Sequence, residues 1–441
     1  MPQRSVLLQS SSVFFLVILG AAGMVYYHLG IFVPGAMEVR ASEGLGNGYS
    51  FGADFYPLWL TTHEGMLHHS DPYSPETTRR IQIGLFGRPL DDNSSLTQDP
   101  RAFANPAFAE LLFWPLALIP FPVLRIGLAV ILAAVTAFSI VLWLRAIRFQ
   151  VDRVMLASLI LLTLSSYSVL EGLFAEQIGL LVGFLLAAAL AALAGQRLFL
   201  SGSLMALALV KPQMMLLVAI YLLLWSLARW RARRLFAAGF ISVSALLAGS
   251  SLLIWPHWIS EWLQVLIRYR QYSTPPLACY VLGGYAGSHF GPVLVAALLA
   301  GALALAWRMR NTSSASFEFA LTISLLLATT VVTLLPGQAV YDHVILLPGI
   351  ILIAMSWRGF AALNRIFRVV LGAGALALFW QWICAPFVIA AQPFLSSRVF
   401  TEAVLTLPIR TAASIPFGVL AVLALMMRQT ALRQNYGREK H

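Results

Sequence analysis

Charged residues are scarce in this sequence. Only 11% of its 441 residues are Asp, Glu, Lys or Arg, whereas 59% are hydrophobic. So few charges cannot cover a water-soluble fold of this size, and they exclude a disordered chain as well. The composition therefore predicts an integral membrane protein.

Cysteine and nucleotide-binding motifs are also nearly absent. The two cysteines, Cys279 and Cys384, cannot form a disulfide framework and have no metal-ligand spacing. His63 and His68 are five residues apart, which places them poorly on one helical face for a shared metal ion. There is no glycine-rich phosphate-binding loop. We therefore predict no cofactor, and no residue here requires a divalent metal.

Long apolar runs recur along the whole chain. Most are about 17–25 residues long, the length that a helix needs to cross the hydrocarbon core of a bilayer. Pro212 separates the fifth run from the sixth, so the pair is either two helices or one long helix. The runs predict about twelve transmembrane helices, at 11–33, 122–144, 154–171, 178–194, 198–210, 213–228, 235–255, 291–307, 317–335, 341–356, 369–390 and 408–427.

The arginines predict the orientation of these helices. Lys and Arg collect in the cytoplasmic loops of membrane proteins. With both termini in the cytoplasm, the clusters Arg145–Arg153, Arg229–Arg234 and Arg358–Arg368 all lie inside, provided that the fifth and sixth runs are two helices. We therefore expect a multi-pass protein of the plasma (inner) membrane.

The formal charge of +11 is spread over these separate inner segments. A nucleic-acid-binding protein instead gathers its basic residues into one patch. We therefore predict no nucleic acid, and membrane lipids as the partners of the arginines.

The predicted fold is an all-α polytopic membrane protein that forms a single membrane domain over residues 1–441. Its first extracytoplasmic loop is long, at 34–121, and a second large outer loop spans 256–290. We expect interfacial helices in the first loop, one beginning near Tyr56 and one within Pro106–Phe121, because a crossing there would move Arg145–Arg153 outside.

Polar residues that stand next to apolar runs on the predicted outer face are the candidate site residues. Asp54 in the first loop could act as a general base, or it could cap the helix near Pro57. Glu171, Glu176 and Gln177 lie at the outer junction of the third and fourth helices, where a carboxylate is either functional or harmlessly solvated.

Two further groups come from later in the chain. Lys211 is one of two lysines and has apolar neighbours, so it either binds an anion such as a lipid phosphate or extends to the headgroups. Asp342 and His343 stand at the outer start of the tenth helix, where they could bind a sugar hydroxyl or phosphate, or Asp342 could cap the helix. Arg268 and Arg270 in the second outer loop are candidates to assist Lys211 at a phosphate.

The order of these short motifs is similar to glycosyltransferase family 87. The resemblance covers about Asp54 to Leu347. Its residues are Ala53-Asp54-Phe55, Trp59, Asp71-Pro72-Tyr73, Asn105-Pro106-Ala107-Phe108, Trp114-Pro115-Leu116, Glu176-Gln177-Ile178, Lys211-Pro212-Gln213 and Tyr341-Asp342-His343-Val344.

This resemblance implies a GT-C-like membrane glycosyltransferase, best known as an α-mannosyltransferase. It implies inverting transfer of a hexose, with mannose expected, from a polyprenyl phosphate donor to a glycan or glycolipid acceptor of the cell envelope at the outer face. It further implies that Asp54 is the general base, that Lys211 lies near the donor phosphate, and that Asp342 and His343 lie near the same site. The chain departs from the family at Glu176-Gln177-Ile178-Gly179, where Gly-Gln-x-Asn is usual, and at Asn105-Pro106, where Pro-Pro is usual.

Other functions remain open from the sequence. Twelve helices with both termini inside are also typical of a transporter or flippase of a lipid-linked or small substrate, although carriers commonly have related halves. A lipid-linked glycan polymerase or ligase would also have its active groups outside. The long outer loop and the outer acids favour the glycosyltransferase.

Overall fold

The protein is helical throughout the part that the structure describes, which is residues 2–42, 49–90, 99–286, 289–361 and 365–438 of a computed structural model. Within these ranges the chain forms no β-strand; one isolated bridge joins Pro276 to Pro336. The predicted all-α membrane architecture is confirmed. Segments 43–48 and 91–98 of the predicted first loop lie outside the described residues.

The N-terminal half consists of a long first helix, a loop unit and a helical bundle. The elements are α1 (Pro2–Tyr27), η1 (His28–Phe32), α2 (Val33–Ser42), α3 (Tyr56–His68), α4 (Pro75–Phe86), α5 (Phe108–Ala117), α6 (Phe121–Ala146), α7 (Arg153–Leu164), α8 (Tyr167–Phe174), α9 (Ile178–Ala194), α10 (Leu198–Leu207), η3 (Ala208–Val210), η4 (Pro212–Met214), α11 (Leu216–Ala228) and α12 (Trp230–Ile254).

The C-terminal half adds two outer helices and completes the bundle. The elements are α13 (Trp258–Tyr269), α14 (Leu277–Ala286), α15 (Phe290–Arg308), α16 (Phe317–Thr333), η5 (Val340–Leu346), α17 (Leu347–Ala361), α18 (Arg365–Ala391), η6 (Gln392–Phe394), α19 (Ser397–Ala412) and α20 (Ile415–Arg438).

Seven helices among the described residues are long and apolar enough to cross a membrane, and the bent pair α7 and α8, with 58° between its members, makes an eighth if it is one span. The predicted number of twelve crossings is not confirmed. All twelve predicted runs are helical, but α9 and α16 have 17 residues and α10 and α11 are shorter still. A helix of 17 residues is about 26 Å long, less than the roughly 30 Å of a hydrocarbon core. Of these short helices, α9 and α16 are buried along most of their length, whereas α10 and α11 keep exposed apolar side chains.

Two boundaries differ from the sequence prediction. The first membrane helix continues through a π-helical turn to Ser42, well beyond Val33. The last run is divided between the end of α19 and α20, which begins at Ile415. The fifth and sixth runs are two helices, as predicted, and the break falls at Lys211 and Pro212.

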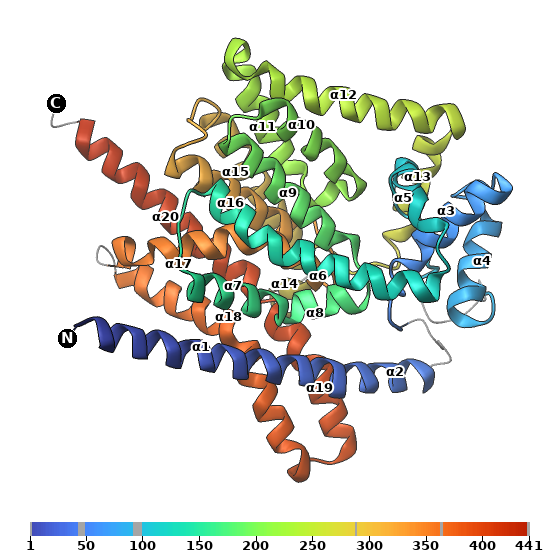
Figure 1. The fold of residues 1–441 in the computed structure, drawn as a ribbon, viewed down its shortest axis with the longest axis horizontal. Helices are drawn as coiled ribbons and strands as arrows, with labels where there is room; N and C mark the ends of the chain where they lie inside the picture. The colour runs from blue at the N-terminus through green and yellow to red at the C-terminus, as the bar shows by residue number, and fades with distance from the viewer. Residues whose placement is uncertain (1, 43–48, 91–98, 287–288, 362–364, 439–441) are drawn as a thin grey trace.

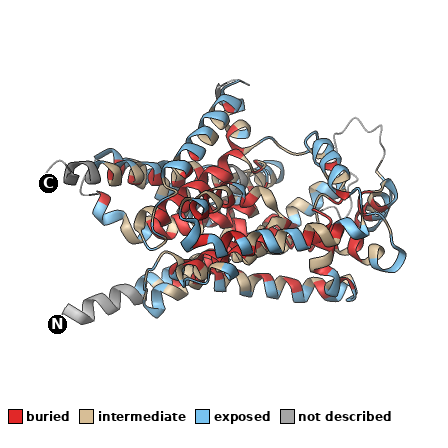
Figure 2. Ribbon diagram, turned by 90° about the horizontal axis from the view of Figure 1, so that it is seen from above, coloured by how far each residue is buried: buried red, intermediate tan, exposed pale blue. Residues whose placement is uncertain are grey.

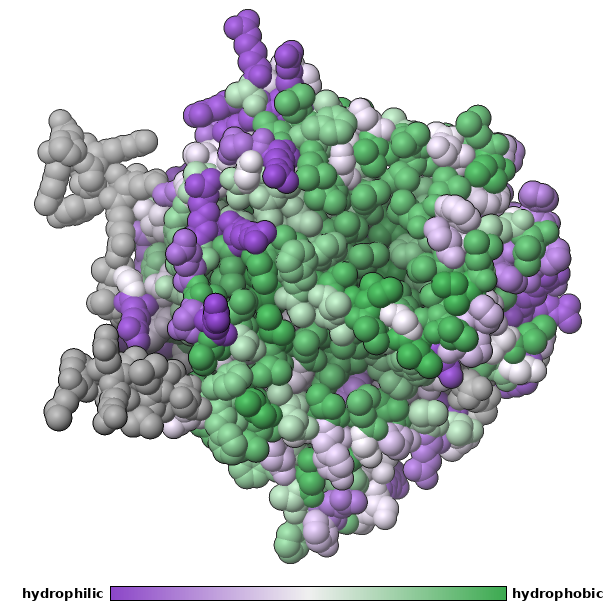
Figure 3. Space-filling model, in the orientation of Figure 1, coloured by the Kyte–Doolittle hydropathy of each residue, from purple (hydrophilic) through white to green (hydrophobic). Residues whose placement is uncertain are grey.

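The elements have a clear polarity. Both termini lie at one end of the molecule, and α3, α4, α5 and α13 gather at the opposite end (Figure 1). Buried residues concentrate on the facing sides of the central helices (Figure 2), while the outward surface between the two ends is apolar (Figure 3). This surface suits the lipid that the composition predicts.

The first loop folds into a packed unit. In α3, Pro57 occupies the first turn, and the helix ends at His69 in the left-handed conformation, which confirms the helix predicted near Tyr56. In α5, ten residues are too few to cross a bilayer. Hydrogen bonds from Tyr73 Oη to the Asn105 carbonyl (2.8 Å) and from Trp59 Nε1 to the Ile119 carbonyl (3.0 Å) tie the loop segments together.

Close packing of α10 on α12 depends on two glycines. A Cβ on Gly202 would press against the Phe236 carbonyl oxygen and lie 2.7 Å from the Phe240 nitrogen, and Gly239 faces the backbone of α10 in the same way. Backbone atoms of a packed helix cannot move aside cheaply. The crossing therefore requires glycine at both positions.

We predict that Gly202→Ala destabilises the protein by about 1–3 kcal/mol, because overpacking separates the two helices. Thermal unfolding of the detergent-solubilised protein, followed by tryptophan fluorescence, should shift down by several degrees. Gly249→Ala, on α12 with no atom within 4 Å of the added Cβ, is the control. Equal unfolding temperatures for the two variants would contradict the proposed packing.

Candidate active site

A polar cavity of about 1230 Å³ lies between the loop unit and the outer ends of the membrane helices. The first loop, α8, the start of α9, the break at Lys211, α13 and η5 all contribute to its wall. The cavity therefore joins segments from distant parts of the sequence. Four predicted site residues line it: Asp54, Gln177, Lys211 and Asp342.

Asp54 lies in a tight turn that is held by the end of α8. The Gly52 amide donates to the Phe174 carbonyl (2.9 Å), and the Asp54 amide donates to the Ala175 carbonyl (3.1 Å). Gly52 has φ +80°, a conformation that favours glycine. The turn therefore fixes Asp54 to α8 independently of its side chain.

The Asp54 carboxylate does not cap a helix. Phe55 is the N-cap of α3, and no side chain caps it. Instead, Oδ1 accepts a hydrogen bond from Arg101 Nη1 (2.6 Å) and Oδ2 accepts one from Gln177 Nε2. The side chain is 19% exposed, so it is oriented by two donors and still reaches the cavity.

Gln177 connects Asp54 to Lys211. Its Nε2 donates to Asp54 Oδ2, and its Oε1 accepts from Lys211 Nζ (3.3 Å). An amide has donors at one end and an acceptor at the other, so a carboxylate on one side and an ammonium on the other fix its orientation. Gln177 thus sets the distance between the acid and the cation.

Lys211 occupies the break between η3 and η4, where its extended backbone separates two short turns. Its Nζ donates to Asp342 Oδ1 (2.6 Å) and lies 4.9 Å from the centre of the Tyr341 ring. The Lys211 side chain is 12% exposed, whereas that of Asp342 is 1% exposed. An ammonium has three donors, so one remains for a ligand after Asp342 and Gln177 are satisfied. Lys211 is therefore held inside the site and does not extend to the headgroups.

Gly179, in the first turn of α9, allows this approach. A Cβ at this position would overlap Asp342 Oδ1 and lie 3.3 Å from Lys211 Nζ. The acidic and basic side chains meet directly above the helix backbone. Gly179 is one of the positions at which the sequence departs from the family pattern.

The other predicted site residues lie away from the cavity wall. Glu176 is fully buried with φ +56°, and both of its carboxyl oxygens have no hydrogen-bond partner among the described residues. Burial raises the pKa of Glu176 to about 8, and the Arg125 guanidinium opposes part of this rise. Arg268 and Arg270 are exposed on α13 and at its C-cap, while Tyr269 between them lines the cavity.

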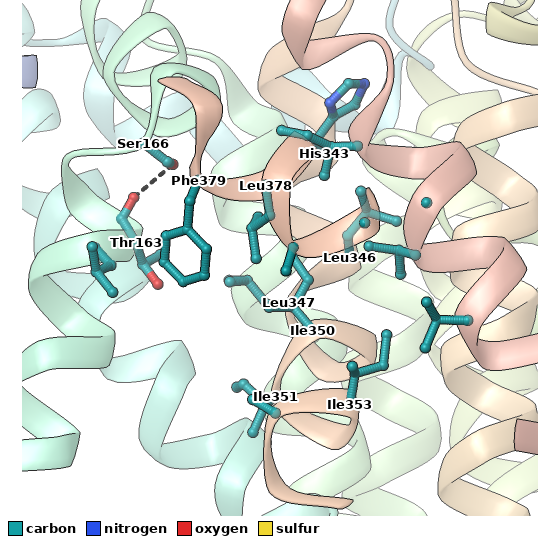
Figure 4. A pocket seen from close by; sticks show the side chains of 18 of the residues that line it. Thr163, Ser166, His343, Leu346, Leu347, Ile350, Ile351, Ile353, Leu378 and Phe379 are labelled. Atoms are coloured by element: carbon teal, nitrogen blue, oxygen red, sulfur yellow. Dashed lines mark hydrogen bonds between the residues drawn. The ribbon is translucent and has the colours of Figure 1, made fainter. Parts of the chain in front are cut away.

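His343 faces a second, apolar cavity. This cavity measures about 610 Å³ and lies among α7, α8, η5, α17, α18 and α20, with His343 at one side of it (Figure 4). Its lining is almost entirely aliphatic and aromatic. Residues of α8 and η5 contribute to both cavities, so these two elements form the wall that separates them.

Arg101 is a cavity residue that the sequence did not single out. It has φ +56° and follows Asp99 and Pro100, and its amide donates to Asp99 Oδ1 (2.9 Å). A basic residue in an outer loop runs against the usual distribution of arginine, but Arg79, Arg80 and Arg88 of the same loop share this signal, so it does not single out Arg101.

No group of three or more His, Cys, Asp or Glu side chains in the described part of the chain is arranged to hold a metal ion. The centre of the cavity wall instead holds Lys211 and Arg101, the carboxylates of Asp54 and Asp342 that they contact, and the Gln177 amide. Such a set can accept a proton at Asp54 and stabilise negative charge at Lys211.

The sequence model of glycosyltransferase family 87 matches residues 103–336. The matched segment contains Gln177 and Lys211, whereas Asp54 and Asp342 lie before and after it. No curated protein and no solved structure matches the chain.

We predict that Gly179→Ala reduces sugar transfer by about tenfold or more, because the methyl group displaces the Asp342 carboxylate and with it the Lys211 ammonium. Initial rates in lipid would measure the loss. Gly195→Ala, at the other end of α9, places its Cβ at ordinary contact distance, 3.5 Å, and should keep full activity. A fully active Gly179→Ala variant would show that the contact is not needed.

Proposed function

The chain belongs to glycosyltransferase family 87, and from this premise we propose that it transfers a hexose from a polyprenyl phosphate to an acceptor hydroxyl with inversion. The protein is a membrane glycosyltransferase. Beyond the family assignment, we propose the lipid-phosphate donor, the inversion of configuration and the catalytic roles of Asp54 and Lys211. Mannose as the sugar and an envelope glycan or glycolipid as the acceptor follow from the family resemblance.

One observation carries the proposal: Asp54 and Lys211 meet in one cavity through the Gln177 amide. Inverting transfer requires a base for the acceptor hydroxyl and a cation for the departing phosphate. Both groups are present, and their spacing is fixed by a hydrogen-bonded side chain.

Asp54 acts as the general base. Its carboxylate takes the proton of the acceptor hydroxyl while the hydroxyl oxygen forms a bond to the anomeric carbon of the sugar. Arg101 and the α8 carbonyls hold the carboxylate in place before the substrate arrives. This arrangement reduces the reorganisation needed in the transition state.

Lys211 stabilises the leaving group. As the bond between the anomeric carbon and the phosphate oxygen breaks, the electron pair passes to the phosphate, which gains one negative charge. The free donor position of Lys211 is available to that oxygen. Asp342 and Gln177 hold the ammonium where this charge develops.

The position of the site supports a lipid-linked donor. The polar cavity lies at the ends of membrane helices, where the head of a lipid-linked sugar would meet the bilayer surface. The arginine distribution favours cytoplasmic termini in the plasma membrane and a site on the outer face. The transporter interpretation has no comparable support, because the family match concerns sugar transfer.

We predict that Asp54→Asn lowers the rate of sugar transfer by about 100-fold or more, because the amide cannot accept the hydroxyl proton. Transfer from a polyprenyl phosphate hexose would be measured with purified protein in lipid vesicles. Asp71→Asn is a matched control outside the cavity, since Asn keeps the oxygen that accepts from the Tyr73 amide. Full activity in a folded Asp54→Asn protein would remove Asp54 from the mechanism.

We predict that Lys211→Ala raises the KM for the donor by about tenfold or more, because the phosphate loses its cation. The variant also leaves Asp342 buried without its partner, which destabilises the fold. The double variant Lys211→Ala, Asp342→Asn removes that charge and should show the same donor defect. Arg398→Ala, which breaks an exposed ion pair, is the control, and an unchanged donor dependence in the double variant would contradict the phosphate role.

A further inference from the structure

A further carboxylate, Glu171, lines the same cavity on the side formed by α2 and α8. Tyr49, Phe32 and Tyr167 line the wall beside it. None of these four residues belongs to the hydrogen-bonded set of Asp54, Gln177, Lys211 and Asp342. The mechanism above gives them no role.

Glu171 is held by groups behind it. Its Oε2 accepts a hydrogen bond from Tyr49 Oη (2.9 Å) and lies 3.5 Å from His28 Nε2. Both contacts use the same oxygen, so Oε1 is the oxygen available to a ligand. The Glu171 side chain is 13% exposed, which is enough to reach a small molecule in the cavity.

His28 is an independent sign that this wall is built for binding. Its side chain is fully buried, and neither ring nitrogen has a hydrogen-bond partner among the described residues. It begins the π-helical turn η1, a kind of insertion that is frequent at functional sites. A buried imidazole without a bonded partner is costly unless it serves a nearby group, and Glu171 is the nearest carboxylate that the structure shows.

Aromatic rings surround the carboxylate. Phe32 stacks on His28 at 5.3 Å between ring centres and meets Tyr167 edge to face at 5.5 Å, while Tyr49 lies 5.2 Å from Phe174. A carboxylate beside aromatic faces presents a strong acceptor on this part of the wall, to which Arg40 of α2 also contributes. This combination suits a sugar ring, which has apolar faces and hydroxyl donors at its edge.

The geometry separates this wall from the proposed phosphate position. Asp54 connects to Lys211 through Gln177, whereas Glu171 on α8 and Tyr49 hydrogen-bond to each other elsewhere on the wall of the same cavity. In an inverting displacement the acceptor enters opposite the leaving group. With the phosphate at Lys211, the acceptor takes the part of the wall that Lys211 does not contact, which holds Glu171.

We propose that Glu171 and Tyr49 form the acceptor subsite, in which the Glu171 carboxylate accepts a hydrogen bond from a hydroxyl of the acceptor sugar. A hydroxyl donates to a carboxylate, whereas an ionised phosphate has no proton to donate and is repelled. The ligand is therefore a neutral sugar ring. The acceptor assignment rests on the proposed transfer, whereas sugar binding at this wall does not.

Steady-state kinetics tests the acceptor role. Glu171→Gln should raise the KM for the acceptor by about tenfold, because a charge-assisted hydrogen bond is lost, and should leave the KM for the donor within about twofold. Tyr49→Phe should shift the same constant in the same direction by a smaller factor. Glu402→Gln, on exposed α19, is the matched control. An unchanged acceptor KM, or an equal rise in the donor KM, would overturn the assignment.

Binding without turnover separates this inference from the proposed function. Saturation-transfer NMR with methyl α-D-mannopyranoside and methyl α-D-glucopyranoside should show binding to the wild type and to Asp54→Asn, and a loss of signal in Glu171→Gln. A signal that depends on Glu171, in a protein that transfers no sugar from any lipid donor, would support the sugar site and overturn the transfer. Active protein with equal signals in the wild type and Glu171→Gln, or with no signal at all, would overturn the subsite.

Discussion

The side-chain amide of Gln177 is the contact on which the site depends. It donates to Asp54 and accepts from Lys211, so the two groups of opposite charge share one fixed separation. Without Gln177, the hydrogen-bonded link between Asp54 in the first loop and Lys211 at the break between η3 and η4 would be lost. Gln177 itself is placed by the change from the left-handed Glu176 to the first turn of α9. The geometry of the centre is therefore set by one junction of two membrane helices.

The surrounding fold makes a charged centre tolerable at a membrane boundary. Lys211 and Asp342 are nearly buried, and each would be costly without the other. The helix breaks at Lys211 and at η5 free the backbone to bring both side chains onto Gly179. Such breaks inside a lipid-facing bundle are stable only where they line a cavity or are packed by neighbours, and here they do both.

The sequence predicted much of this site because charges next to apolar runs must find partners. Asp54, Gln177, Lys211 and Asp342 were all identified in this way, and they meet in the cavity. The sequence could not show which of two adjacent residues lines the polar cavity. Successive residues of a 3₁₀-helix point about 120° apart, so Asp342 and His343 face different cavities. The side chains of Glu176 and Gln177 also point in different directions, because the backbone of Glu176 is in the left-handed conformation.

Features that depend on tertiary packing could not be predicted from the sequence. The ion pair between Arg101 and Asp54 joins residues 47 positions apart, and no local pattern links them. The hydrophobic runs located the helices, but run length could not show that α9, α10, α11 and α16 are as short as the structure has them. The most direct test of the central claim is the anomeric configuration of the product, determined by NMR after transfer by purified protein in lipid from a polyprenyl phosphate hexose of known configuration. We expect an inverted linkage; a retained linkage, or no transfer from any such donor, would disprove inverting transfer from a polyprenyl phosphate.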